Sequence, residues 1–304
     1  MPQVMDQSLS ELPSFDKLDK RLTREWDIGA SPARAVETAR QFSNLLLLRA
    51  SSIDLARDLK PVWHAAEVLW DSMEFDDAEI LVTRWRKTVV SVAERQGIDP
   101  TEARIWSAIL SAELEHRLRN YGTAVNYARA AMTEIRTLAG GEKNLRRALK
   151  LGRVTPVTEM HCAALAIAIP AARVHFAKRP HLRVQFLDRW IDDALLILDR
   201  DLPPPLLRVH ALVIQTYYAI AELSKNDDRV AWLDRLERFD DLVRPRTLRG
   251  QKTKRLRGVA RARFNGDGEL EREEAVAAHR DLVDMPRHVK ALTANGWWPR
   301  VVNQ

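Results

Sequence analysis

Apolar residues recur along this chain at intervals of three and four, the spacing that places them on one face of an α-helix. One such face contains Ile105, Ile109 and Ala112, and a second contains Leu110, Leu114 and Leu118. No alternating polar and apolar run of strand length interrupts the pattern. The sequence therefore predicts an all-α protein.

Prolines divide the helical pattern into segments, because proline fits the first turn of a helix, where its missing N–H is not needed. Helical patterns follow Pro32, Pro61, Pro100, Pro156, the run Pro203–Pro205, Pro245 and Pro286. Three of these prolines come directly after a residue that suits a helix cap, namely Ser31, Asp99 or Thr155. We expect seven helices to begin at these positions.

Short polar breaks between the proline starts predict reversals of the chain. They lie at Glu74–Asp76, Arg119–Gly122, Lys178–Pro180, Lys225–Asp228 and Asn265–Gly268. Two helices joined by so short a turn run antiparallel. From Pro61 onward, counting Pro205 for the triple run, the starts are 39, 56, 49, 40 and 41 residues apart. Repeated spacing of this size favours a helical solenoid over a closed four-helix bundle.

One window resembles the tetratricopeptide-repeat class of helical hairpins. Within Arg104–Ile135 it has Trp106, Ile109 and Leu110, the turn Asn120-Tyr121-Gly122, and then Ala124, Ala128 and Ala131. Weaker windows contain Trp63, Ala66, Phe75, Ala78 and Val82, and further on Phe264, Gly266-Asp267-Gly268, Ala275 and Ala278. The chain departs from the family by lacking the glycine of the first helix and by its variable repeat length, and HEAT-like hairpins look similar.

The resemblance implies a right-handed α-solenoid that binds a protein or peptide partner on its helical surface. We expect an N-terminal extension at 1–31, partly disordered or a short helix, a hairpin repeat domain at 32–294 and a tail at 295–304. The resemblance also implies a scaffold or regulator without catalytic residues.

Composition narrows the class of protein. The 304 residues are 46% hydrophobic and 30% charged, which is typical of a globular protein. The lone Cys162 lies among apolar residues and cannot form an internal disulfide, which favours the cytoplasm. No apolar run reaches membrane-spanning length, and the first ten residues lack the positive charge of a secretory signal. The excess of arginine over lysine and the many alanines indicate a bacterial source.

Total charge does not favour nucleic acid, since 48 basic residues face 42 acidic ones. The distribution is uneven, however, because residues 242–266 contain nine basic side chains and no acid. The candidate contacts to an anion, nucleic acid or acidic partner are Arg249, Lys252, Lys254, Arg257 and Arg261. Alternatively, the glutamates at 269–274 neutralise the segment. A second basic cluster, Lys143, Arg146, Arg147, Lys150 and Arg153, follows two glycines and is predicted to be a loop or short helix.

The N-terminal region has a weak helix-turn-helix signal. Helical patterns at Leu18–Ile28 and Pro32–Leu48 flank the turn Gly29-Ala30-Ser31. Arg24 and Thr38 fall where such a motif needs apolar contacts. We therefore prefer a loose N-terminus followed by the start of the repeats.

Motifs for catalysis are absent from the sequence: there is no phosphate loop, G-x-S-x-G, H-E-x-x-H or paired C-x-x-C. Glu113 and His116 have metal-ligand spacing, but a di-iron bundle needs a second copy of that motif. His64 and Glu67 have the reverse order, and we expect a surface hydrogen bond or ion pair there. Cys162 is predicted to be a buried apolar residue. We assign no catalytic, cofactor or metal residues.

The C-terminal sequence contains adjacent tryptophans, Trp297 and Trp298, after a glycine that stops the last helix. They are candidates for capping the end of the last hairpin, or for contacting a partner or a second copy in a homodimer. We therefore expect a non-catalytic interaction or regulatory protein with a protein or peptide partner. The alternatives are a nucleic-acid-binding protein that uses residues 244–263 and, third, a metal-dependent helical-bundle enzyme.

Overall fold

The computed structural model describes residues 13–27, 31–50, 53–97, 99–198 and 208–223, and these residues are helical with no strand. The elements are α2 (Phe15–Leu22), the π-helical turn η1 (Thr23–Asp27), α3 (Pro32–Leu48), α4 (Leu55–Asp71), α5 (Phe75–Arg95), α6 (Thr101–Arg117), α7 (Tyr121–Leu138), α8 (Glu142–Leu151), α9 (Pro156–His175), α10 (Pro180–Leu198) and α11 (Val209–Leu223). The prediction of an all-α protein is confirmed for this part of the chain.

Three of the predicted proline starts agree with the helix bounds. α3 and α9 begin at their prolines, and α6 begins one residue after Pro100. Thr155 caps α9 in a capping box with Thr158, and the Asp99 carboxylate accepts hydrogen bonds from the Thr101 N–H and hydroxyl. Ser31, in contrast, makes no side-chain cap bond. The starts at Pro203–Pro205, Pro245 and Pro286 lie outside the described residues.

The predicted start at Pro61 is wrong. α4 begins six residues earlier, at Leu55, where the Asp54 carboxylate accepts a hydrogen bond from the Arg57 N–H. Pro61 therefore lies inside the helix, where it removes one backbone hydrogen bond. Its ring is buried, and tertiary packing outweighs the local cost of the proline. The aspartate cap was the stronger signal at this position.

Consecutive helices are joined by short turns of one recurring kind. After α4, Met73 has a positive φ of 68° and the Glu74 N–H donates to the Leu69 carbonyl at 2.9 Å. After α6, Arg119 has a φ of 66°, and the N–H of the next residue, Asn120, donates to the carbonyl of Glu115, five residues earlier, as the Glu74 N–H does to Leu69. This bond pattern ends a helix and reverses the chain. The predicted breaks at Glu74–Asp76, Arg119–Gly122 and Lys178–Pro180 each overlap an observed turn, at 72–74, 118–120 and 176–179, and each extends one or two residues into the next helix.

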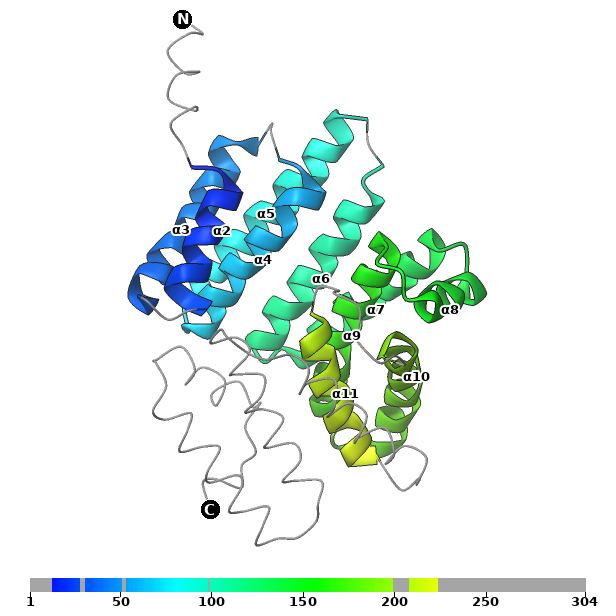
Figure 1. Cartoon of the computed structure of the whole chain (residues 1–304). Helices are drawn as coiled ribbons and strands as arrows, with labels where there is room; N and C mark the ends of the chain where they lie inside the picture. Colours follow the sequence, from blue (N-terminus) through cyan, green and yellow to red (C-terminus); the bar gives the residue numbers. More distant parts are fainter. Residues whose placement is uncertain (1–12, 28–30, 51–52, 98, 199–207, 224–304) are drawn as a thin grey trace, which may run out of the picture.

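The helices from α2 and α3 to α8 follow one another across the molecule, and α10 and α11 lie below α9 in this view, with α11 on the side of α6 (Figure 1). Each packs against its near neighbours along the chain: α4 contacts α2, α3, α5 and α6, and α9 contacts α6, α7, α8, α10 and α11. As a result α2, α4, α6, α9 and α11 each contact the next member of this series, while α3 packs on α5 behind them. α2 belongs to this array, because its Phe15, Leu18 and Leu22 are buried.

The core is a single continuous cluster of apolar side chains. The alanines at 124, 128 and 131 of α7 are fully buried, which lets α7 lie close to α6 and α9, as their spacing predicts. α9 is long and apolar enough to span a membrane by length and composition, but 78% of that window is buried inside the protein. Its neighbours on every side identify it as the central core helix.

The second basic cluster is a short helix. α8 buries Leu145 and Leu149 and leaves its basic side chains on the other face, so the alternative of a loop is wrong. The left-handed residues Gly141 and Gly152 bound the helix at its two ends. α8 packs on α9 and α10, where Arg146 comes within 3.9 Å of the buried Asp193 carboxylate.

Candidate functional site

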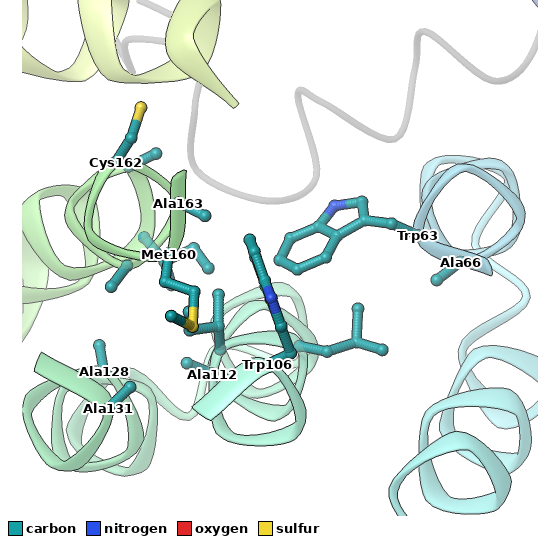
Figure 2. Close-up of a cluster of buried hydrophobic side chains, with 14 of the residues drawn as sticks. Trp63, Ala66, Trp106, Ala112, Ala128, Ala131, Met160, Cys162 and Ala163 are labelled. Carbon is teal, nitrogen blue, oxygen red and sulfur yellow. The ribbon is translucent and has the colours of Figure 1, made fainter. Parts of the chain in front are cut away.

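The site is built first from tryptophans on two helices. Trp63 of α4 points toward Trp106 of α6, and their rings meet edge to face with centroids 6.2 Å apart (Figure 2). Both side chains are buried. One helical face of α4 continues from Trp63 through Glu67 to Trp70 and Asp71, at the spacing of three and four that brings side chains together. The carboxylates of Glu67 and Asp71 therefore lie on the same face of α4 as the two tryptophans.

Charged side chains from α4, α6 and the residue before α11 meet beside these tryptophans, and we call them the buried ion network. The Arg117 guanidinium donates to Glu113 at 2.8 Å and to Asp71 at 3.2 Å. The Arg208 guanidinium donates from Nη2 to Glu113 at 3.0 Å and from Nη1 to Glu67. The network therefore joins three carboxylates and two guanidiniums, with Glu113 as the shared acceptor.

Burial is what separates this network from ordinary surface ion pairs. The Glu113 side chain is 1% exposed and those of Asp71 and Arg117 are 4% and 5% exposed. Arg208 and Glu67 keep slightly more accessible surface, at 9% and 13%. Charges taken out of water are costly unless they are paired and hydrogen-bonded, so removal of one member should be strongly destabilising.

Arg208 is placed by an uncommon backbone conformation. It precedes α11 and has a φ of 67°, the left-handed region that non-glycine residues rarely adopt. Its guanidinium carbon lies 5.9 Å from the centre of the Trp63 ring, and that of Arg117 lies 5.6 Å from Trp70. Both distances fit cation–π contacts. Each arginine is thus held by carboxylates and by an indole face.

The network shifts the pKa values of its members. Burial alone would raise the pKa of Glu113, but Arg208 and Arg117 outweigh burial and lower it below its usual value. Burial would lower the pKa of Arg208, and here Glu113 and Glu67 prevail and raise it. His116 shows the opposite balance: burial lowers its pKa to about 4, with Glu113 opposing and both arginines reinforcing the shift. The network therefore holds Glu113 charged and His116 neutral at pH 7.

The metal hypothesis for Glu113 and His116 is not favoured by this geometry, because the Glu113 carboxylate is already bound by two guanidiniums. Among the described residues, no group of three or more histidine, cysteine or acidic side chains could hold a metal ion. His64 and Glu67 do take part in a hydrogen bond and an ion pair, respectively, as expected, but neither side chain is on the surface. The His64 side chain is 7% exposed and its Nδ1 lies 2.6 Å from the Asp19 carboxylate of α2.

A third buried histidine, His161, precedes Cys162 in α9. His161 Nε2 is 3.3 Å from the Asp193 carboxylate of α10, and its Nδ1 has no hydrogen-bond partner within the described part of the chain. Cys162 is buried, as predicted, and burial raises the pKa of its thiol. Consecutive helix residues face different directions, so His161 is not placed as a base for the thiol. The contact between His161 and Asp193 links α9 to α10.

The remaining predicted contact residues cannot be placed. The basic segment with Arg249, Lys252, Lys254, Arg257 and Arg261, its alternative acidic partners and the tail with Trp297 and Trp298 all lie outside the described residues. So do the turns at Lys225–Asp228 and Asn265–Gly268 and the window from Phe264. At the N-terminus, Thr38 is buried and its hydroxyl donates to Glu25 at 2.8 Å, while Arg24 is exposed. At the position where a helix-turn-helix needs an apolar contact, this chain therefore has the hydrogen bond between Thr38 and Glu25.

Sequence reasoning singled out two of the three carboxylates of the network, Glu67 and Glu113, but neither Asp71 nor the arginines. Glu67 and Glu113 were selected for metal-ligand spacing, and the available signal for an ion pair was Arg117, four residues after Glu113. Arg208 gave a weaker signal, as a lone arginine between a proline run and an apolar helix. The comparisons with protein-family models, curated proteins and solved structures found no match to this chain.

Proposed function

We propose that the chain is a right-handed solenoid of antiparallel helical hairpins, similar to tetratricopeptide repeats. The supporting observation is the packing order, in which α2, α4, α6, α9 and α11 each contact the next while α3 and α5 pack behind them. Hairpins that contact only their neighbours form an open, curved row rather than a closed bundle. The helix pairs α4/α5, α6/α7 and α9/α10 would each be one repeat, and α8 would be an insertion.

We further propose that this row binds a protein or peptide partner and has no catalytic function. The partner would bind on the surface shared by α4, α6, α9 and the start of α11, which we call the α4/α6/α9 face. Two ion pairs cross this face: Arg208 reaches Glu67 of α4, and Lys60 of α4 reaches Glu159 of α9 at 3.1 Å. In a curved row of hairpins, this face would be the concave side that holds an extended segment.

The observation that carries this proposal is the concentration of buried charge and tryptophan on that one face. A purely structural repeat needs only an apolar seam between its helices, whereas Glu67, Glu113 and Arg208 are charges taken out of water at a cost. Aromatic and arginine side chains are also the types that dominate binding energy at protein interfaces.

Peptide selection with matched charge reversals tests this function. A random phage-displayed peptide library is panned on the immobilised full chain, and the affinity of recovered peptides is measured by fluorescence anisotropy. Lys60→Glu alters an exposed residue of the α4/α6/α9 face, and Lys87→Glu alters an exposed lysine of α5 as the control. We expect Lys60→Glu to change the affinity of peptides bound at this face about tenfold, on the order of 1.4 kcal/mol, and Lys87→Glu to leave it unchanged. Equal effects of the two variants would refute the assignment of the face.

Nucleic-acid binding is the second candidate function, because residues 242–266 combine nine basic side chains with no acid. Contacts to phosphates release counterions and weaken steeply with salt. The triple variant Lys254→Glu, Arg257→Glu and Arg261→Glu should abolish retention of nucleic acid in a low-salt gel-shift experiment if this candidate is right. Unchanged retention would exclude it, and the peptide affinity of the triple variant should equal that of the wild type.

A further inference from the structure

Arg208 is held in the way that a protein holds a bound arginine. Its two terminal nitrogens bond to different carboxylates, of Glu67 and Glu113, and its guanidinium lies over the Trp63 ring. We call Glu67, Glu113 and Trp63 the guanidinium seat. Glu113 and Trp63 form its floor, at 1% exposure each, and the more accessible Glu67 is at its mouth. Charge-assisted bonds of this fork geometry are specific for arginine over lysine.

The fit of Arg208 in this seat is imperfect in two respects. Its φ of 67° is a strained backbone conformation for a non-glycine residue. Its Nε is buried without a hydrogen-bond partner among the described residues, and the indole nitrogen of Trp63 is likewise buried and unpartnered. An arginine delivered by another chain would be free of the first constraint. The backbone carbonyl of that arginine would be an acceptor for the indole N–H of Trp63.

The charge of the network strengthens the preference for a cation. With Arg208 in place, two guanidiniums face three carboxylates. If Arg208 withdrew, the buried Glu113 carboxylate would lose one of the two guanidiniums that bind it. A buried carboxylate with less pairing is costly, so entry of another cation favours the withdrawal of Arg208. The seat is therefore suited to exchange of one guanidinium for another.

We propose that the guanidinium seat is a binding site for an arginine side chain of a peptide partner, and that Arg208 occupies it from within the chain until the partner's arginine replaces it. The proposal rests on the proposed function and specifies its ligand chemistry. Because Arg208 and the partner's arginine compete, the structure predicts that loss of the Arg208 side chain increases affinity for arginine. A structural ion pair alone predicts no such gain.

The test measures binding to Arg208→Gly, since glycine accepts a positive φ without strain and removes the side chain. The probe is N-acetylarginine methylamide, titrated into the wild type and the variant with tryptophan fluorescence as the readout, at constant ionic strength. An internal occupant that fills the seat nine times in ten weakens an external ligand about tenfold. We therefore expect the variant to bind the probe about tenfold more tightly than the wild type. Equal or weaker binding by the variant would overturn the proposal.

Matched variants and probes define the site and the source of the ligand. Glu67→Gln in the Arg208→Gly background should abolish the gain, whereas Glu79→Gln, an exposed glutamate of α5, should retain it. The lysine analogue of the probe should bind more weakly, because it lacks the fork. If methylguanidinium bound tightly and N-acetylarginine methylamide did not, the seat would take a small free ligand and the peptide proposal would be wrong.

A folding defect leaves the proposal testable. If Arg208→Gly unfolds, Arg208→Lys keeps a positive charge and the stem but can satisfy only one carboxylate well, and it should still bind the probe more tightly than the wild type. Wild-type affinity in Arg208→Lys would contradict the competition. Failure of the peptide-library experiment, with a clear gain for the arginine probe, would refute the proposed function at the α4/α6/α9 face and leave the seat as a site for free guanidinium compounds.

Discussion

His116 makes the stability of the folded chain depend on pH in a defined window. Its imidazole is buried beside Glu113, Arg117, Arg208 and the ring of Tyr121, and its pKa is lowered from 6.5 to about 4. The unfolded chain therefore binds a proton at this residue near pH 6.5, while the folded chain does so only near pH 4. Because the unfolded state binds more protons between these values, stability falls as the pH is lowered through this window.

The magnitude follows from the two pKa values. A shift from 6.5 to about 4 corresponds to roughly 3 kcal/mol when the window is crossed completely. Between pH 7.5 and pH 5 the same relation gives about 2 kcal/mol. Glu113, whose pKa is lowered, loses its stabilising contribution only at lower pH, as the pH falls below the usual glutamate range. The comparison of pH 7.5 with pH 5 therefore isolates the histidine from this carboxylate.

The assay is urea unfolding of the wild type, His116→Gln and His181→Gln at pH 7.5 and pH 5. His181 is an exposed histidine of α10 and serves as the control. We expect the wild type and His181→Gln to lose about 2 kcal/mol more than His116→Gln over this range. The reasoning is refuted if all three proteins show the same pH dependence.

Three further predictions concern the packing of α7, α8 and α9. Gly122→Ala should stabilise α7 by at most about 1 kcal/mol, and only in a His175→Ala background, because the added Cβ would lie 2.9 Å from the His175 ring. Urea unfolding of Gly122→Ala with and without His175→Ala measures this, and equal effects in the two backgrounds would contradict the contact. Cys162, buried and with a raised pKa, should react with a thiol reagent only as fast as the chain unfolds, and rapid labelling of the folded protein would show the burial to be wrong. Leu145→Ala in α8 should lower the free energy of unfolding by about 2–5 kcal/mol, because Leu145 is buried. Leu151→Ala, at an exposed position, should lower it by less than about 0.5 kcal/mol. An equally small loss for both variants would place α8 outside the core.

The helical class and several helix ends followed from the sequence because their signals are local. Periodicity and a cap such as Thr155 act within one turn, and the structure confirms them. Pro61 shows the limit of that logic, since a buried proline is tolerated inside α4 where packing compensates for the missing bond. α8 was ambiguous for a similar reason. Its polar composition indicates a loop, and only its two buried leucines, which contact distant helices, favour the helix.

The site was less accessible to sequence reasoning, because its defining contacts are non-local. Glu67 and Glu113 each have a histidine at metal-ligand spacing on the same helix, and that local pattern gives no sign of the distant arginine that binds them. The residue that changes the interpretation is Arg208, which lies 141 positions from Glu67 in the sequence. No period or motif predicts a contact at that separation. Only the fold that brings Arg208, the residue before α11, beside α4 and α6 joins two glutamates and a tryptophan around its guanidinium.

The most direct test of the account is a double-mutant cycle between Arg208 and Glu67, measured by urea unfolding of the wild type, Arg208→Gln, Glu67→Gln and the double variant. The two groups are partly buried and hydrogen-bonded, so we expect a coupling free energy of about 2 kcal/mol, within the range for neighbouring groups of one network. The same cycle between Arg208 and Glu79, an exposed glutamate of α5, should give no coupling. A coupling of zero between Arg208 and Glu67 would contradict the guanidinium seat and the convergence of helices that creates it.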